Sequence, residues 1–559
     1  MQLKIIASVL ACAVAASQSC WAQVAIPPGL EPGQIQQQLR QLRMPAATSA
    51  PSAPRAPEQL APPETDSLRF VLRDVQIEGV TVYANAELPK AFAPLIGKEI
   101  SVAQVFDVAN QLTARYRGDG YILSQVLVPA QNIVDGHVKL IAVEGYVAAV
   151  DYRGDVAQNA VLDSYSLALR NARPLTASVL ERYLLLMNDF SQTTARGTLV
   201  PATSAAGAAD LVVDFKREKA RAAFDGNNRN SRSLGPWRAS SDLEWDGAIS
   251  SWDAVTLRAG WSPHDELSYA NLGYGAPLGT RGARWSVGAT GVRSRPGIAA
   301  NLAATDLKTE SVSGLVQVSY PLLRSRSLNL QVRGALTSFD GQSEFSLGDV
   351  SDDRLRALRA GLSLDITDRW RGITILDAEY SQGLNGLGAR EAGTAESPLS
   401  RLSGRPDFSK LTLYAARLQS LGGRWSALLA VSAQRAFTTL LAPELFAFGG
   451  ELMGRGYDAA ELAGDSGESA KVELRYFATL SQWGALTPYA FFDAGRVQRR
   501  DPINESEHER ASSLGAGLRW TGPDGRWNGF VELADPRNHV VAAEGNRDAR
   551  VFAGLQVSF

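Results

Sequence analysis

Apolar and polar side chains alternate with a period of two from about residue 219 to residue 559. One face of a typical segment carries Val312, Gly314, Val316, Val318 and Tyr320. The opposite face carries Ser311, Ser313, Gln317 and Ser319. A β-strand with this pattern presents one apolar and one polar surface. Roughly sixteen such segments can be marked, which suits a transmembrane β-barrel with an apolar lipid face and a polar lumen.

A soluble β-sandwich or propeller shows the same alternation, so other features must choose between these folds. The chain has eleven tryptophans, and all except Trp21 lie beyond residue 236. Aromatic belts at both membrane interfaces would explain this segregation. The final segment puts Val551, Ala553, Leu555, Val557 and Phe559 on one face. We therefore predict a membrane all-β fold, with a barrel of about 16 transmembrane strands over residues 219–559.

The first 22 residues have the features of a secretory signal. A single positive charge precedes an apolar run over residues 5–16, and small residues lead to a cleavage site before Gln23. Both cysteines, Cys12 and Cys20, lie in this segment, so we expect neither disulfides nor cysteine metal sites in the mature chain. A lipid-modified Cys20 and a buried N-terminal helix are the alternatives.

Residues 23–44 contain a predicted amphipathic helix between Gly29 and Met44. Three apolar residues lie at helical spacing along it: Ile35, Leu39 and Leu42. Residues 45–66 then hold many prolines among Ala, Ser and Thr, a composition that stays extended and acts as a tether. The helix is too small to fold alone, and the tether leaves it free to dock elsewhere in the molecule.

Residues 67–145 and 146–218 share an order of predicted elements: strand, helix, helix, strand, strand. In the first unit, one helix is expected at residues 87–95. The other is capped by Ser101, with Gln104 completing a capping box. The interpretation is two small α+β modules in tandem, and the alternative is one irregular α+β domain.

The second unit repeats this order with its own helix signals. A helix is expected near residues 160–171, and another after Ser178, with Glu181 as its capping-box partner. A strand is expected to end the unit at residues 210–216.

Composition and motifs disfavour nucleic-acid binding and catalysis. The formal net charge is −2 and charged residues make up 20 %, so there is no basic field to hold nucleic acid. The four histidines are not at metal-ligand spacings, and the chain has neither a nucleophile elbow nor a phosphate-binding loop. His264 next to Asp265 could suggest a hydrolase site, but a histidine in a surface loop is the simpler interpretation. We expect no enzyme activity, no cofactor and no metal.

The segment with most information is a glycine-rich loop predicted at residues 446–470. Its central run is Gly454, Arg455, Gly456 and Tyr457. A later apolar strand carries Asp493 as an isolated carboxylate, with Phe492 and Gly495 beside it. A mobile extracellular loop and an ordinary lumen-facing charge would explain these residues. The more specific hypothesis is that Arg455 pairs with Asp493.

Four short stretches together carry a family resemblance: Gly454–Tyr457, Leu462–Asp465, Glu473–Arg475 and Phe492–Gly495. They resemble the transporter partner (TpsB) of two-partner secretion systems, the family of haemolysin-secretion/activation and filamentous-haemagglutinin transporters. The resemblance extends over nearly all of the mature chain. The family usually has valine or a similar residue before the arginine, whereas this chain has Gly454, so we expect a more flexible loop tip.

The resemblance implies a fold and a function. Residues 67–145 and 146–218 would be polypeptide-transport-associated (POTRA) domains in the periplasm, and the barrel would lie in outer-membrane lipid. Loop 446–470 would fold into the lumen, where Arg455 would meet Asp493 and latch the loop. The helix with Ile35, Leu39 and Leu42 would plug the pore.

The resemblance also implies partners. A large unfolded exoprotein would be captured by the modules, enter the pore as the helix leaves it, and fold at the surface. Phe559 would serve as the signal to the barrel assembly machinery, and we expect a monomer. The alternatives are an assembly factor of the same superfamily, a passive porin, and an outer-membrane enzyme, for which no residues can be nominated.

Overall fold

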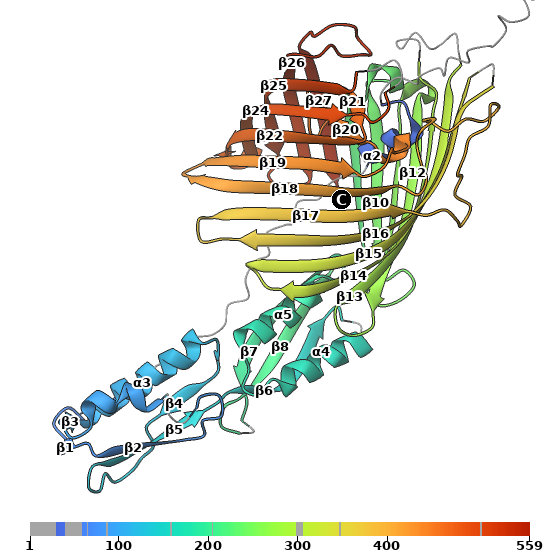
Figure 1. Ribbon diagram of the computed structural model, residues 1–559. Coiled ribbons are helices and arrows are strands. Elements are labelled where there is room, and N and C mark those ends of the chain that lie inside the picture. Colours follow the sequence, from blue (N-terminus) through green and yellow to red (C-terminus); the bar gives the residue numbers. More distant parts are fainter. Residues whose placement is uncertain are drawn as a thin grey trace, which may run out of the picture.

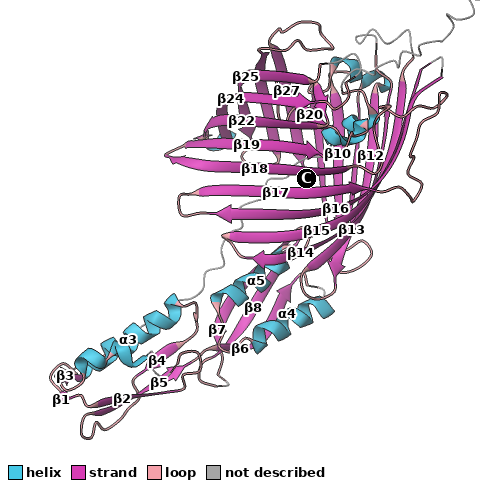
Figure 2. Cartoon of the chain, viewed as in Figure 1, coloured by secondary structure: helices cyan, strands magenta, loops and turns pink. Residues whose placement is uncertain are grey.

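The computed structural model shows two small α+β modules below a large β-barrel (Figure 1). It describes residues 29–39, 59–63, 65–84, 88–156, 159–203, 205–297, 306–345, 348–502 and 506–559. Helices lie in the modules and at the upper part of the barrel, and the barrel wall consists of strands (Figure 2). Among the described residues, no helix is both long enough and apolar enough to cross a membrane.

The described residues form a closed antiparallel barrel of sixteen strands, as predicted, if β22 and the short β23 are counted as one strand. In chain order the strands are β9 (Ala220–Asn227), β10 (Arg238–Asp246), β11 (Ala254–Trp261), β12 (Leu267–Leu278), β13 (Ala283–Ser294), β14 (Lys308–Arg324), β15 (Leu328–Phe345), β16 (Gly348–Thr367), β17 (Gly372–Gly383), β18 (Ser409–Gly422), β19 (Trp425–Ala436), β22 (Ser466–Tyr476), β23 (Ala478–Thr479), β24 (Ala485–Gln498), β25 (His508–Thr521), β26 (Trp527–Pro536) and β27 (Arg550–Ser558). The last strand pairs with the first, with Leu555 opposite Gly226.

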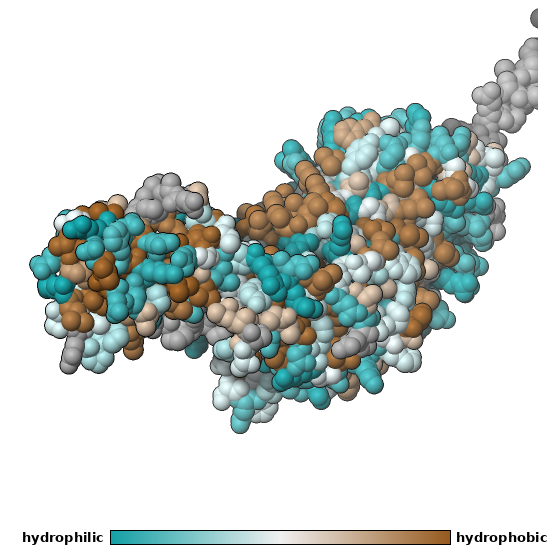
Figure 3. Space-filling model, turned by 90° about the horizontal axis from the view of Figure 1, so that it is seen from below, coloured by the Kyte–Doolittle hydropathy of each residue, from teal (hydrophilic) through white to brown (hydrophobic). Residues whose placement is uncertain are grey.

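The alternation predicted from the sequence sets which side chains face outward. On β14, Val312 is 62 % exposed and Val316 is 50 % exposed, while Ser311 on the other face is buried. Hydrophobic residues accordingly show on the flanks of the barrel (Figure 3). This apolar outer wall suits contact with lipid.

The two ends of the barrel differ. Short turns join the strands at the end beside the modules, here called the module end, and the longest loops, 384–408 and 437–465, lie at the far end. Eight tryptophans lie at the module end: Trp245, Trp252, Trp285, Trp370, Trp425, Trp483, Trp520 and Trp527. Only Trp237 and Trp261 lie at the far end. Tryptophan therefore gathers at the module end, whereas exposed aromatic residues toward the far end include Tyr380 and Phe437.

The first module contains a three-stranded sheet and one long helix. Its elements are β1 (Arg69–Val71), β2 (Asp74–Glu78), β3 (Glu99–Ser101), α3 (Val102–Gly118), β4 (Gln125–Leu127) and β5 (His137–Val143). The capping box of Ser101 and Gln104 forms as predicted. The helix predicted at residues 87–95 is wrong: two 3-10 turns, η1 (Leu88–Ala91) and η2 (Ala93–Leu95), replace it. Pro89 and Pro94 lack the backbone N–H that a continuous helix needs.

The second module repeats this topology with both helices present. Its elements are β6 (Tyr146–Gly154), α4 (Ala160–Asn171), α5 (Ala177–Asn188), β7 (Thr193–Pro201) and β8 (Ala208–Arg217). The sheet orders β2-β5-β4 and β6-β8-β7 correspond strand for strand. The predicted cap of α5 is wrong by two residues, because Thr176 accepts from the N–H of Val179 and Ser178 already lies inside the helix.

The second module is packed onto the barrel. Trp252, from the turn between β10 and β11, lies in the core of the module, with its ring centroid 4.4 Å from that of Phe190. Arg324 of β14 makes a bidentate ion pair with Asp189, with N–O distances of 2.9 and 2.6 Å. These contacts fix the module end of the barrel directly over the second module.

Candidate functional site in the barrel lumen

The loop between β19 and β22, residues 437–465, folds back into the barrel. It contains η7 (Ala442–Glu444), β20 (Phe446–Phe448) and β21 (Leu462–Gly464), and β20 and β21 pair only with each other. Figure 1 shows β20 and β21 in the upper part of the barrel. The helix α2 (Pro32–Leu39) lies in the same part. The predicted range 446–470 ends too late, because β22 begins at Ser466 and residues 466–470 belong to the wall.

Arg455, in the turn of this loop, contacts Asp493 on β24. The Arg455 Nε and Nη2 atoms lie 3.0 and 2.8 Å from the two carboxylate oxygens. The backbone N–H groups of Arg455 and Gly454 also donate to Asp493, at 2.9 and 3.2 Å. Both side chains are buried, with exposures of 3 % and 0 %. A bidentate, charge-assisted contact of this kind fixes orientation as well as distance.

Two further carboxylates surround the same guanidinium. Glu473 on β22 accepts from Arg455, and it also contacts Arg475 and Arg519 at 2.6 Å. Glu532 on β26 lies 3.7 Å from Arg455. Neither Glu473 nor Glu532 has a role that was predicted from the sequence. For Glu473 a signal existed, since it lies on the polar, lumen-facing side of an alternating strand.

Glu532 has partners of its own on the barrel wall. It accepts from Arg229 at 2.9 Å and from the hydroxyl of Tyr489 at 2.7 Å. Phe491 lies against Arg455, with the guanidinium carbon 3.5 Å from its ring centroid. The loop arginine therefore enters a preformed acidic and aromatic recess of the wall.

The other predicted loop residues pack closely around this contact. Gly454 has a φ of +91°, a conformation rare for residues with a side chain, and an added Cβ would lie 2.8 Å from Phe448. Gly456 donates its N–H to Ser513 at 3.2 Å, and the hydroxyl of Tyr457 donates to the Ser512 carbonyl at 3.0 Å. A glycine before Arg455 is therefore what this turn requires.

The predicted wall residues divide between two faces. Gly495 faces the loop, and the Phe448 ring fills the space where its Cβ would lie. Phe492 is 48 % exposed and points outward, so its predicted part in the contact is wrong. Neighbouring residues of a strand face opposite sides, which is why Phe491 and not Phe492 meets the arginine.

The loop is held to the wall at other points as well. Asp465 accepts from Arg401, in the loop between β17 and β18, and from the N–H of Leu440 within its own loop, both at 2.7 Å. Glu444 of η7 accepts from Arg359 at 2.6 Å and pairs with Lys410 at 2.7 Å. All these bonds come from side chains or loop backbone, and none adds the loop to the barrel ladder.

The helix α2 lies beside this loop in the far half of the lumen. Ile35 is fully buried and packs with Leu30, Leu267 and Val292. Gln36 donates to Ser311 of β14 at 3.0 Å. The helix predicted over residues 29–44 thus forms at least from Pro32 to Leu39. The side chain of Leu39, and the whole of Leu42, lie outside the described residues.

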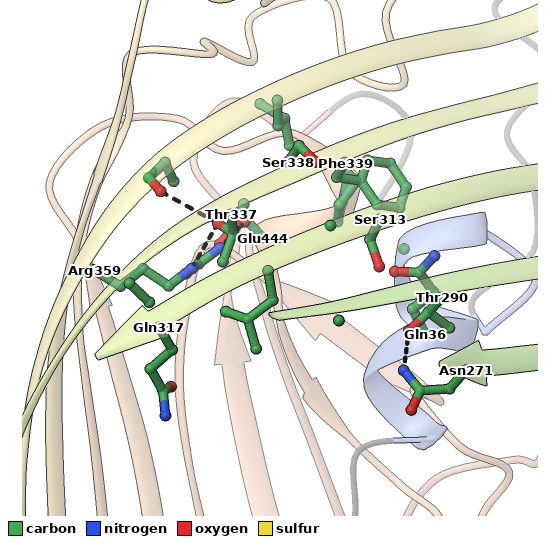
Figure 4. Close-up of a pocket in the computed structure, with 18 of the residues that line it drawn as sticks. Gln36, Asn271, Thr290, Ser313, Gln317, Thr337, Ser338, Phe339, Arg359 and Glu444 are labelled. Carbon is green, nitrogen blue, oxygen red and sulfur yellow. Dashed lines mark hydrogen bonds and ion pairs between the residues drawn. The ribbon is translucent and has the colours of Figure 1, made fainter. Parts of the chain in front are cut away.

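A polar cavity of about 420 Å³ separates α2 and η7 from the wall. Figure 4 shows Gln36 of α2 near Asn271 and Thr290, and Arg359 reaching Glu444 across the cavity. Within the described ranges, no group of three or more His, Cys, Asp or Glu side chains is placed to hold a metal ion. The lumen therefore holds a solvent-sized space beside the two inserted segments.

Phe559, the predicted assembly signal, lies at the seam of the barrel. Its backbone N–H donates to the carbonyl of Ala222 at 2.8 Å, and the N–H of Ala222 donates back at 3.3 Å. Its ring lies 6.2 Å from that of Phe224, and 67 % of the residue is exposed.

Comparison with known proteins identifies relatives of the whole chain. The family model for haemolysin secretion/activation protein ShlB/FhaC/HecB matches residues 207–520, and the ShlB-type POTRA domain matches residues 70–145. The heme/hemopexin transporter protein HuxB of Haemophilus influenzae (strain 86-028NP) is 22 % identical over 495 residues, covering 85 % of each chain.

Solved structures show the same fold. CdiB from Escherichia coli superposes with a TM-score of 0.72 at 18 % identity, covering 90 % of this chain and 94 % of that one. BamA from Haemophilus ducreyi lacking POTRA domains 1–3 superposes with a TM-score of 0.50 at 13 % identity, covering 88 % and 100 %.

The family model covers more than half of the chain, from within the second module through most of the barrel. The module end therefore faces the periplasm and the far end faces the cell exterior. The chain belongs to the haemolysin secretion/activation (ShlB/FhaC/HecB) family, the outer-membrane transporters of two-partner secretion.

Proposed function

We propose that this protein captures an unfolded exoprotein in the periplasm and moves it through the barrel to the cell surface. One observation carries the proposal: the lumen is filled by two segments that form no part of the closed ladder of strands. The helix α2 and the loop 437–465 are held by side-chain contacts, so both can move while every strand pairing of the wall is kept.

The Arg455 contacts suit a reversible latch. A buried arginine and carboxylate stabilise each other when paired, and either one alone is a poorly solvated charge. The loop therefore has a well-defined closed position and a cost for leaving it. In the proposed cycle, the arriving chain displaces α2 and meets a polar wall, where weak and repeated contacts favour passage over tight binding.

Capture uses the periplasmic modules. The strands β2 and β4 form the edges of the first sheet, and β6 and β7 form the edges of the second. An extended polypeptide can add to such an edge through backbone hydrogen bonds, with little demand on its sequence. Folding of the exoprotein outside the cell would then bias its movement outward. We expect the transporter to act as a monomer whose C-terminal strand, ending at Phe559, is recognised by the barrel assembly machinery.

Export can be tested once the neighbouring genes have been searched for one that encodes a large exoprotein with a signal peptide, since that exoprotein would be the substrate to use. Cells making both proteins should carry the exoprotein on the surface or in the medium, and cells making the exoprotein alone should retain it in the periplasm. The BamA-like fold makes an assembly factor the second candidate. That role predicts loss of unrelated barrels from the outer membrane when this protein is removed. Such a loss, with unchanged exoprotein export, would overturn the proposal.

A further inference from the structure

A cluster of basic side chains lies on the outer wall of the barrel at its far end. It consists of Arg435 on β19, Arg496 on β24, and His508 and Arg510 on β25. All four are exposed and point away from the lumen. We call these four residues the rim cluster.

The strand register brings like charges together in this cluster. Arg496 lies directly opposite Arg510 in the pairing of β24 with β25. Directly opposed like charges destabilise a sheet unless something neutralises them. Glu468 on β22 pairs with Arg496 at 2.6 Å, and His508 lies 3.4 Å from Glu507. The side chains of Arg435 and Arg510 make no ion pair or hydrogen bond within the described part of the chain.

The cluster stands at the upper boundary of the apolar wall. Toward the middle of the barrel, the same outward faces carry exposed apolar residues: Leu413, Val431, Val472, Phe492 and Leu514. Phe492 and Arg496 are four positions apart on the same strand, which corresponds to about 13 Å. The change from apolar to basic side chains therefore falls where lipid tails give way to headgroups.

A groove of about 440 Å³ joins the two regions. Leu411 and Leu413 line its apolar part, and Arg435, Arg496 and His508 line its charged part together with Glu468, the partner of Arg496. The two far-end tryptophans do not lie near the rim cluster. Trp237 comes just before β10 and Trp261 ends β11, whereas the cluster lies on β19, β24 and β25. The contact with headgroups in this sector rests on arginine.

We propose that the rim cluster and this groove bind a phosphorylated lipid of the outer leaflet, lipopolysaccharide. The phosphate of the lipid neutralises Arg510 and shares Arg496 with Glu468, and Arg435 donates to it from β19, which β22 separates from β24. Guanidinium groups bind phosphate through paired, charge-assisted hydrogen bonds. An acyl chain of the same molecule lies against Leu411 and Leu413, so one ligand satisfies both parts of the groove.

The test compares lipids that differ only in phosphate. The full-length protein in detergent is titrated with bisphosphorylated lipid A and with its dephosphorylated form, and bound lipid is counted by native mass spectrometry. Wild type should prefer the phosphorylated lipid. The triple variant Arg435→Ser, Arg496→Ser and Arg510→Ser should bind it about tenfold more weakly or worse, the loss expected when charge-assisted contacts are removed.

A matched control comes from the other side of the barrel. Arg293 on β13 also points outward near the far end, but it pairs with Glu310 at 3.3 Å. Arg293→Ser should bind lipid A as wild type does. Resistance of each variant to detergent unfolding before heating confirms that the barrel has formed. Equal binding by the triple variant, equal loss in Arg293→Ser, or no preference for the phosphorylated lipid would each overturn the proposal.

Discussion

Three carboxylates lie around the single positive charge of Arg455. Asp493, Glu473 and Glu532 all approach its guanidinium, and each of these carboxylates is almost completely buried. Arg475 and Arg519 share Glu473, so the recess is a network. Removing the partner of a buried ion costs about 3–5 kcal/mol, because a charge is then left without compensation. Several buried ion pairs of the loop thus converge on one side chain, in addition to the contacts that Glu444 makes elsewhere on the wall.

Replacing Arg455 by alanine should reduce exoprotein export strongly while the barrel still inserts in the membrane. The reason is that the loop loses a contact of about 3–5 kcal/mol, whereas the strand ladder is untouched. Export is measured as the fraction of exoprotein outside the cell. Arg475→Ala is the control, because Arg475 binds Glu473 from the wall and does not touch the loop. Normal export by Arg455→Ala would rule out the latch.

Glu144, in the first module, gives a prediction about pH. Burial pushes its pKa up, but hydrogen bonds from Thr81, Tyr116 and Val82 outweigh burial and lower its pKa below the ordinary 4.5. A carboxylate with a lowered folded-state pKa stabilises the fold above its unfolded pKa, and that stability is lost as pH falls through the folded value.

The first module should therefore lose protection in acid below about pH 4.5. Hydrogen exchange of α3 in the full-length protein, corrected for intrinsic rates, measures this effect. Glu144→Gln should be less protected at neutral pH and should show a much smaller acid dependence. Glu78→Gln, which removes an exposed partner of Lys139, is the control. An unchanged acid dependence in Glu144→Gln would assign the effect to other groups.

At the scale of elements, α2 and η7 fit together through a glycine. An added Cβ at Gly33 would lie 2.4 Å from Pro443, so the two segments touch by backbone. The helix is short, and isolated helices of this length are unstable in water. Its position therefore depends on Ile35, Gln36 and this close approach.

Gly33→Val should displace α2 and raise the ion conductance of the protein in planar bilayers. Deletion of residues 29–44 should raise it at least as much, since the helix is then absent. Gly291→Val on β13 is the control, because an added Cβ there has open space around it. Conductance equal to wild type in the deletion variant would show that α2 does not close the pore.

At the scale of the whole molecule, the second module and the barrel form one packed unit. Trp252 stacks on Phe190 inside the module, and Arg217 lies over its ring at 5.2 Å. The first module joins the second at Gly145, whose carbonyl accepts from Leu175 at 2.9 Å. The second module is thus held at the module end of the barrel, and the first module extends from it (Figure 1).

Trp252→Ala should loosen the second module from the barrel, by about 3–5 kcal/mol as for other buried aromatic residues. Hydrogen exchange in α4 and α5 of the full-length protein should rise, and export should fall. Trp370→Ala is the control, because Trp370 lies in another module-end turn and is 66 % exposed. If both variants exchange alike, Trp252 is not a structural link.

Local patterns determined a large part of this structure. Alternation marked the lipid face of β14, and Ser101 with Gln104 marked the start of α3, because these features depend on residues close in the chain. The same local rules failed where prolines replaced a helix by η1 and η2. They also failed at Ser466, where glycine and serine hide the beginning of a wall strand.

The sequence by itself determined that this chain forms a barrel with two modules and that Arg455 is an unusual charge in a glycine-rich loop. Only the tertiary structure decided that Glu473 and Glu532 join Asp493 around it, that Phe491 and not Phe492 meets it, and that Trp252 enters the second module. The physical reason is the register of the strands. Periodicity assigns each side chain to the inner or outer face, but strand pairing and closure of the barrel decide which distant residues lie next to each other.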